Sequence, residues 1–188
     1  MTDQPTALDL PMVDPLPEAT QRYFDICDEK LGFVPNVLKA HAFDIDKLNA
    51  FTALYNDLML APSGLSKLER EMVAVVVSAT NRCHYCLVAH GAAVRQLSGD
   101  PKLGEMLVTN WRVAPVDARV RAMLGFAEKI TLASATIEEA DREALRGHGL
   151  TDRDIWDLAN VAAFFNMSNR VASATAMAPN DEYYGQAR

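Results

Sequence analysis

Apolar residues recur at helical spacing along most of the chain, and this pattern constrains the fold more than any other feature. Between residues 44 and 59 they stand three or four positions apart, at Leu48, Phe51, Leu54, Tyr55 and Leu58. This spacing places them on one face of a helix. No segment alternates apolar and polar residues for long enough to predict a strand. The sequence therefore predicts an all-α fold.

Boundary signals divide the pattern into separate helices. Gly32 and Gly99 are typical of helix ends, and Ser66, three residues before Glu69, is typical of a capping box at a helix start. Three consecutive valines at 75–77 would also suit a buried strand, but the capping box before them indicates a buried helix. Helices are expected at about 18–31, 35–40, 44–59, 66–79, 83–97, 102–109, 117–131, 137–147 and 151–177.

The first seventeen residues follow a different pattern. They contain four prolines, which favour extended backbone: Pro5, Pro11, Pro15 and Pro17. We expect one domain over 1–188, with an extended Pro-rich arm at 1–17 and a helical body at 18–188. The arm also carries Leu8, Leu10, Met12 and Val13. A monomer of this size has little room to bury them, so we expect a homo-oligomer in which the arm lies on a neighbouring protomer.

The charge and hydropathy of the chain exclude several classes of protein. Its formal net charge is −7 without a basic run, which argues against nucleic-acid and anionic-membrane binding. The longest apolar run, residues 72–79, is far shorter than the roughly 20 residues of a membrane span. The N-terminus has no positive segment followed by an apolar one, so we expect no secretory signal and a cytoplasmic location. Disulfides do not persist as staples there, and a close cysteine pair would cycle or bind metal.

A single cysteine pair concentrates the chemistry of the sequence. Cys83 and Cys86 are three residues apart, which makes their side chains neighbours on a helix and allows a disulfide. If Cys83 opens the helix, both sulfurs lie in the first turn, where the helix dipole favours thiolate. His90 stands one turn beyond Cys86 on the same face. It could take the thiol proton or deliver a proton to a leaving group.

A carboxylate in the preceding helix complements this group. The turn between the two helices is predicted at Asn81, about ten residues after Glu71 and nine before His90. Residues equidistant from the turn of a helical hairpin face each other, so we expect Glu71 opposite His90. The carboxylate would hold the imidazole and raise its basicity. The series carboxylate, imidazole, thiol is the arrangement of an activated nucleophile.

An internal repeat appears at an offset of 85 residues. Residues 64–66 match 149–151, and Asn81 matches Asn166. The repeat predicts two similar helical-hairpin units. At the chemical positions the second copy has Trp156, Ser168, Val171 and Thr175 in place of the glutamate, the two cysteines and the histidine. We therefore expect only the first unit to carry the active site, and the second to be structural.

Other interpretations of these residues remain open. A CxxC pair is often half of a zinc site, and Cys83 and Cys86 with His90 or His84 would supply three or four ligands, although a second CxxC is missing. We assign no cofactor and no metal to the site. The residues are compatible with a dithiol–disulfide oxidoreductase acting on a protein or a small thiol. A non-enzymatic zinc-binding or redox-sensing interaction protein is another hypothesis.

The set Glu71, an eleven-residue spacer, Cys83-x-x-Cys86 and then x-x-x-His90 resembles the active-site signature of the alkylhydroperoxidase D-like proteins. These belong to the carboxymuconolactone decarboxylase superfamily. Residues 32–36, 78–86 and 90–95 resemble the uncharacterised peroxidase-related branch of that superfamily. The resemblance implies an all-α fold with a duplicated helical unit, and assembly as a dimer or a trimer of dimers.

The resemblance also implies thiol-dependent reduction of organic (alkyl) hydroperoxides. Cys86 would attack the peroxide and become a sulfenic acid, and Cys83 would resolve it to a disulfide. Glu71 and His90 would relay protons, and an external dithiol of unknown identity would reset the pair.

One departure from the family pattern concerns two supporting candidates, Tyr85 and His84. The best-studied members carry His directly before the second cysteine, where this chain has Tyr85, and the histidine here stands at position 84. The reductant and the details of the relay therefore do not carry over from the resemblance.

Overall fold

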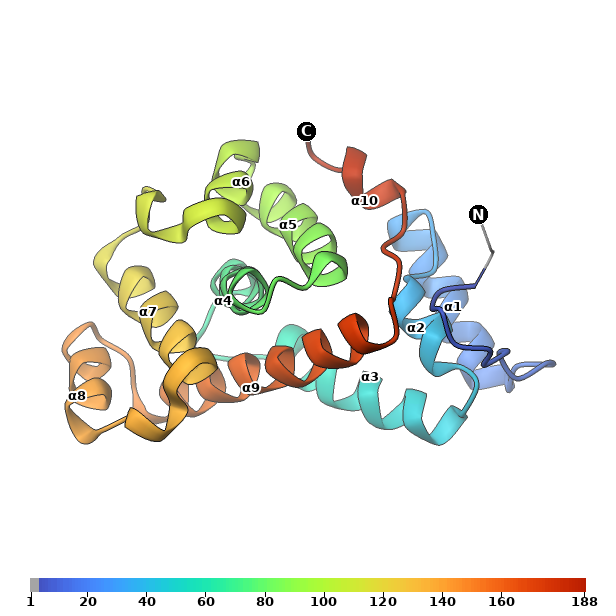
Figure 1. Cartoon of the computed structure of the whole chain (residues 1–188), viewed down its shortest axis with the longest axis horizontal. Helices are drawn as coiled ribbons and strands as arrows, with labels where there is room; N and C mark the ends of the chain where they lie inside the picture. Colours follow the sequence, from blue (N-terminus) through green and yellow to red (C-terminus); the bar gives the residue numbers. More distant parts are fainter. Residues whose placement is uncertain (1–3) are drawn as a thin grey trace.

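The structure is a computed structural model that describes residues 4–188 (Figure 1). These residues form α-helices and two short 3₁₀ turns, and contain no strand, so the predicted all-α fold is confirmed. The α-helices are α1 (Glu18–Leu31), α2 (Asn36–His41), α3 (Ile45–Leu60), α4 (Lys67–Thr80), α5 (His84–Ser98), α6 (Pro101–Asn110), α7 (Ala118–Ala133), α8 (Glu139–Gly147), α9 (Asp152–Ala174) and α10 (Glu182–Gly185). The sequence did not predict α10.

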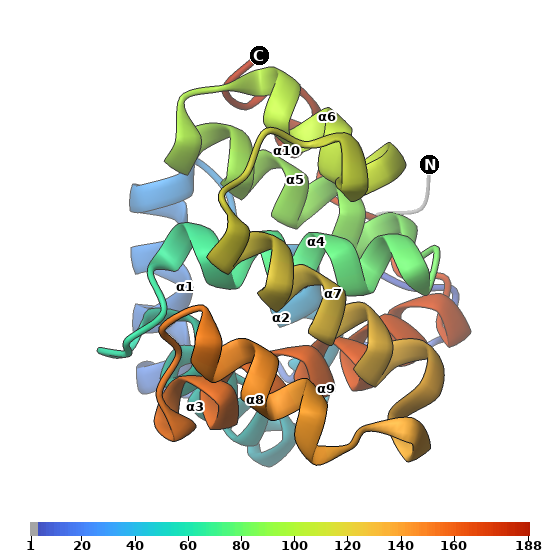
Figure 2. The ribbon, with the colours of Figure 1, turned by 90° about the vertical axis from the view of Figure 1, so that its left-hand side faces the viewer.

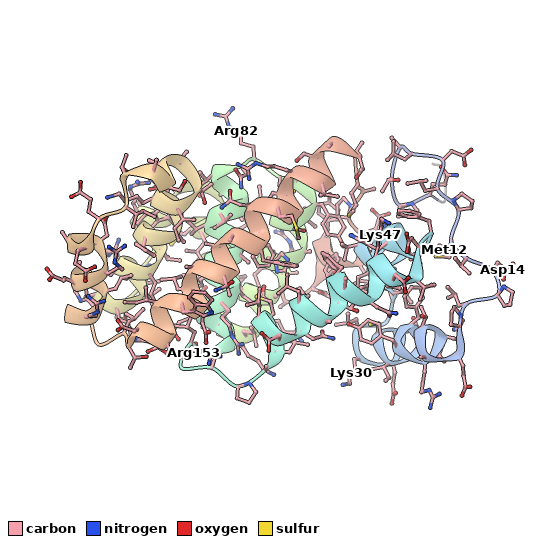
Figure 3. The ribbon with its side chains drawn as sticks, turned by 90° about the horizontal axis from the view of Figure 1, so that it is seen from below. Met12, Asp14, Lys30, Lys47, Arg82 and Arg153 are labelled. Atoms are coloured by element: carbon pink, nitrogen blue, oxygen red, sulfur yellow. The ribbon has the colours of Figure 1, made fainter. Side chains whose placement is uncertain are left out.

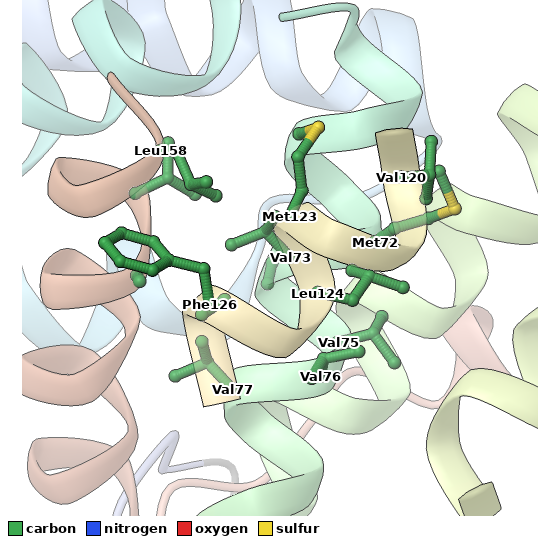
Figure 4. Close-up of a cluster of buried hydrophobic side chains, with 14 of the residues drawn as sticks. Met72, Val73, Val75, Val76, Val77, Val120, Met123, Leu124, Phe126 and Leu158 are labelled. Carbon is green, nitrogen blue, oxygen red and sulfur yellow. The ribbon is translucent and has the colours of Figure 1, made fainter. Parts of the chain in front are cut away.

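Helix α4 forms the centre of the molecule. Figure 1 looks almost along its axis and shows α5, α6, α7 and α9 around it. Every residue from Arg70 to Ser78 is buried, as expected for a helix that is apolar on nearly all sides. Its valines pack against α7 and α9, where Met123, Leu124 and Leu158 are fully buried (Figure 4).

The start of α4 is fixed by the predicted capping box. The backbone N–H of Glu69 donates to Oγ of Ser66 at 3.2 Å, and the backbone N–H of Ser66 donates to Oε2 of Glu69 at 2.7 Å. Two N–H groups that the first helical turn would leave unpaired are thus satisfied. The valine run is helical, as this signal indicated.

A tight turn joins α4 to α5 where the sequence placed it. Asn81 ends α4, Arg82 adopts a left-handed conformation with φ of 55°, and the extended Cys83 precedes α5. Arg82 projects outward at this turn (Figure 3). The two helices then lie side by side, as Figures 1 and 2 both show. The hairpin brings the start of α5 and the body of α4 into one site.

The second repeat begins like the first but does not form a hairpin, which corrects the expectation of two such units. Thr151 and Asp154 form a capping box equivalent to that of α4. Helix α9 then continues to Ala174 through the positions that match the α4–α5 turn. Met167 stands at the position of Arg82 and stays helical, so nothing reverses the chain. The helix ends before the predicted residue 177, and Ala176 has a positive φ of 50°.

The N-terminal arm forms no helix or strand in the residues described, 4–17, and α1 begins at Glu18 as predicted; residues 1–3 lie outside the described part. Its backbone contacts the same chain: Ala7 N–H donates to the carbonyl of Thr175, and Val13 N–H donates to that of Ala42, both at 2.9 Å. Its apolar side chains remain 37–45% exposed: Leu8, Leu10, Met12 and Val13. Asp14 stands at the outer edge of the molecule (Figure 3).

The C-terminal segment contacts both α2 and α5. Asn180 accepts a hydrogen bond from the N–H of Asn36 at 2.7 Å and donates to the carbonyl of Val34 at 3.1 Å. The buried guanidinium of Arg95 on α5 donates to the carbonyls of Tyr183 and Gln186. The segment thus ties α2 to α5. Among residues 4–188, no helix is both long and apolar enough to cross a membrane.

We propose that the chain assembles as a homo-oligomer and that the exposed apolar side chains of the arm contribute to the interface. Light scattering should give a mass at least twice the 20.7 kDa of one chain. Deleting residues 1–15 should shift the equilibrium toward smaller species, because it removes that apolar surface. A monodisperse monomer of the full chain at micromolar concentration would contradict this proposal.

Candidate active site

Glu71 and His90 meet across the α4–α5 hairpin. Oε2 of Glu71 and Nδ1 of His90 are 2.6 Å apart, so the contact that the hairpin register predicted is present. An ionised carboxylate can only accept a hydrogen bond, so Nδ1 carries the hydrogen. Nε2 is then the ring nitrogen available to accept or release a proton.

Burial strengthens this contact. The side chains of His90 and Glu71 are only 13% and 10% exposed. The ring of Phe165 from α9 packs edge-on against the imidazole, with centroids 4.5 Å apart. A hydrogen bond in such surroundings is stronger than one in water. The carboxylate and the phenyl ring together fix the orientation of the imidazole.

The two cysteines stand at the start of α5, as the sequence indicated. Cys83 is the residue directly before the helix, and Cys86 lies in its first turn. Both are free thiols, and they are only 1% and 2% exposed. The N-terminal end of a helix favours negative charge on a neighbouring sulfur.

The two thiols divide this charge unequally. A hydrogen bond from the Cys86 thiol, supplemented by the Cys86 backbone N–H, lowers the pKa of Cys83 to about 6. The same bond to Cys83, together with burial, raises the pKa of Cys86. The two thiols therefore titrate as a coupled pair in which the thiolate form of Cys83 is the favoured one.

A cavity of about 520 Å³ opens beside these residues. Cys86, His90 and Glu71 all line it, whereas Cys83 does not. Much of the wall consists of aromatic rings from α3, α5, α9 and the C-terminal segment: Phe51, Tyr55, Tyr85, Phe164, Phe165 and Tyr183. The volume and the apolar wall are typical of a site for a small molecule.

Comparisons with known proteins agree with this geometry. Residues 46–129, which include Glu71, both cysteines of the pair and His90, match the family model described as the carboxymuconolactone decarboxylase family. An uncharacterized peroxidase-related protein from Silicibacter sp. TM1040 is 75% identical, with all of both chains covered and a TM-score of 0.97. The chain belongs to the carboxymuconolactone decarboxylase family.

A second solved structure links this member of the family to the AhpD core. It is described as an alkylhydroperoxidase AhpD core and an uncharacterized peroxidase-related protein, from Ralstonia eutropha JMP134. It is 43% identical, covers 98% of this chain and 97% of its own, and gives a TM-score of 0.94. The debrominase Bmp8 in complex with 2,3,4-tribromopyrrole shares only 16% identity at a TM-score of 0.80, which shows a common fold alone. None of the curated proteins matches the sequence.

The two supporting candidates of this family member occupy different surroundings. Tyr85 lines the cavity, and its hydroxyl accepts a hydrogen bond from the N–H of Val37 at 3.0 Å, which links α5 to α2. His84 is exposed, and its Nε2 lies 2.8 Å from the hydroxyl of Tyr184. The structure thus brings Tyr85 to the cavity and turns His84 toward the C-terminal segment.

Helix α9 supplies polar groups to the thiols that the sequence interpretation missed. Hydrogen bonding from Asn169 and Ser168 lowers the pKa of Cys86, opposing the larger effects of Cys83 and burial. Asn169 is itself held in place, since it donates to Ser78 and accepts from Asn81, both at 3.0 Å. Ser168 also lines the cavity. Ser168, expected to be structural, therefore lies beside Cys86 and the cavity.

One alternative interpretation depended on a metal. Within residues 4–188, the structure brings no three His, Cys, Asp or Glu side chains into a cluster that could hold a metal ion. His84, a potential ligand by sequence, instead contacts Tyr184.

The contribution of α9 can be measured on the thiol directly. In a Cys83→Ser protein the Cys86 thiol titrates without its partner. Adding Ser168→Ala should raise the pKa of Cys86 by about one pH unit, because a hydrogen bond to a charged group is lost. The ultraviolet absorbance of the thiolate, followed against pH, gives this value.

Ser173→Ala is the matched control, since Ser173 hydrogen-bonds to Cys83 rather than to Cys86. It should leave the Cys86 titration unchanged in the same background. Equal titration curves for the Ser168 variant and its parent would show that Ser168 does not stabilise the thiolate.

Proposed function

We propose that the protein is a thiol-dependent peroxidase that reduces organic hydroperoxides through Cys86 and Cys83. One observation carries this proposal: Cys86 and the His90–Glu71 pair line the same apolar cavity. A hydroperoxide in that cavity would meet a nucleophile and a proton-transfer group together. Membership of a family with peroxidase-related relatives supports the same chemistry.

The first step oxidises Cys86. Its sulfur, after losing the thiol proton, attacks the terminal oxygen of the hydroperoxide. A sulfur–oxygen bond forms, the oxygen–oxygen bond breaks, and the leaving alkoxide takes a proton to become the alcohol. His90 is placed to exchange both protons through Nε2, because Glu71 occupies Nδ1. The product on the protein is a sulfenic acid at Cys86.

The second step engages Cys83. Its thiolate attacks the sulfur of Cys86, a disulfide forms, and hydroxide leaves and is protonated to water. The hydrogen bond from Cys86 lowers the pKa of Cys83 and so favours the thiolate form that this attack requires. The two thiols supply the two electrons that reduce the peroxide. An external dithiol must then return the disulfide to two thiols.

Burial of the thiols separates this function from the alternatives. Cys83 and Cys86 are 1% and 2% exposed, and Cys86 lines the cavity. A folded protein disulfide could not reach either sulfur without rearrangement, whereas a small hydroperoxide could. The small-molecule reaction is therefore favoured over dithiol exchange with a protein partner.

Substitution of each cysteine tests the order of steps. Cys86→Ser should abolish hydroperoxide consumption in stopped-flow assays of the reduced protein, because the attacking sulfur is gone. Cys83→Ser should permit one turnover and leave a sulfenic acid that a trapping reagent labels. Undiminished turnover by Cys86→Ser would refute the assignment of the attacking thiol.

The carboxylate is tested separately. Glu71→Gln keeps a hydrogen-bonding side chain against His90 but removes the negative charge, so the helices should still pack. The rate of thiol oxidation should fall about 10²–10⁴-fold, the usual range for general acid–base catalysis. Unaltered circular dichroism would confirm the fold, and an unaltered rate would exclude the relay.

A further inference from the structure

The cavity is lined by more lysines than carboxylates, although the chain as a whole is acidic. The formal net charge is −7, yet two lysines, Lys30 and Lys67, lie in the cavity wall. The only carboxylate in that wall, Glu71, is engaged with His90. Within residues 4–188, neither lysine takes part in an ion pair. The cavity thus offers two ammonium groups to whatever enters it.

The two lysines come from different helices and stand at the mouth. Lys30 lies in the last turn of α1, as Figure 3 shows, and Lys67 is the first residue of α4. Both are exposed, whereas Cys86 is only 2% exposed. The cavity therefore runs from a cationic mouth to a buried sulfur.

The hairpin register sets the distance between mouth and sulfur. Glu71 faces His90, so Lys67, four residues earlier on α4, lies level with about position 94 of the antiparallel α5. Position 94 is eight residues beyond Cys86, and eight residues of helix span about 12 Å. On this stretch α5 presents the small side chains of Ala89 and Ala93 to the cavity.

The opposite wall is apolar. Phe51, Tyr55 and Phe164 form a continuous group of rings, with centroids 5.4 Å apart for Phe51 and Phe164 and 6.0 Å apart for Tyr55 and Phe164. Ile26, Leu31 and Leu60 extend the apolar lining from α1 and α3. A hydrocarbon chain would lose its contact with water along this passage, which favours binding. Hydrogen peroxide would gain nothing from such a wall.

We propose that the substrate is a fatty-acid hydroperoxide, bound with its carboxylate against Lys30 and Lys67 and its hydroperoxide group at Cys86. The hydrocarbon segment between the two groups spans the apolar passage of about 12 Å. This proposal rests on the proposed peroxidase function. It adds that the site recognises an anionic head as well as an apolar body.

Kinetics with matched substrates test the anionic head. The hydroperoxide of an 18-carbon unsaturated fatty acid and its methyl ester differ only in the charge of the head group. We expect a kcat/KM about tenfold higher for the acid at low ionic strength, and a smaller preference at high salt, because both lysines are exposed to solvent. The double variant Lys30→Gln/Lys67→Gln should bring the ratio of acid to ester close to one. Lys102→Gln on α6, an exposed lysine away from the cavity, is the control and should leave the ratio unchanged.

A binding measurement separates the failure of this inference from the failure of the peroxidase function. Calorimetric titration of Cys86→Ser with the unoxidised fatty acid and with its ester requires no catalysis. Tighter binding of the acid, lost in the double lysine variant, supports the anionic site even if no hydroperoxide oxidises the thiols. Equal binding and equal kcat/KM for acid and ester would overturn the inference, while rapid oxidation by both would leave the peroxidase function intact.

Discussion

The burial of α4 is the constraint on which the rest of the structure depends. A helix with apolar residues on nearly every side must be surrounded, and α5, α6, α7 and α9 surround it. Glu71 is carried into the interior by this burial, where a lone carboxylate would be costly. His90 offsets that cost from the next helix. The contact that stabilises the core is thus the contact that orients the imidazole, so packing and chemistry cannot be separated here.

Local signals were sufficient to predict much of the fold. The capping box at Ser66 distinguished helix from strand for the valine run, and the turn at Asn81 gave the register that placed Glu71 opposite His90. The second repeat failed as a guide for a physical reason. Whether the chain continues as a helix or turns at position 167 depends on the backbone conformation of a single residue. The sequence similarity around Asn166 does not predict that conformation. The sequence of the short α10 has no strong helical pattern. The helix is held in place by a hydrogen bond from Arg95, a residue far from it in the sequence.

The candidate site shows the same division between local and distant information. Cys83 stands directly before α5, and Cys86 and His90 lie within it, so their proximity could be predicted from their spacing. Ser168 and Asn169 reach the thiols from a helix more than eighty residues away, and only the packing of α9 against α4 and α5 reveals them. The repeat did contain a clue. The two copies pack against each other, and Asn81 donates a hydrogen bond to its counterpart Asn166 at 3.1 Å. Residues that follow Asn166 in the sequence therefore lie close to residues that follow Asn81.

The division of charge between the thiols has a consequence for the order of chemistry. The hydrogen bond between the two sulfurs lowers the pKa of Cys83, outside the cavity wall, and raises the pKa of Cys86, which faces the cavity. The thiol that an entering molecule meets is thus the one that holds its proton more tightly. Reaction needs transfer of that proton either to Cys83 or to Nε2 of His90. Transfer to Cys83 would neutralise the sulfur that must later attack Cys86, whereas transfer to His90 preserves it and loads the imidazole with the proton that the leaving alkoxide requires. In the second route His90 only transfers protons and Cys83 only attacks the oxidised sulfur. The imidazole that Glu71 holds beside the cavity is therefore a better acceptor for the proton of Cys86 than Cys83 is.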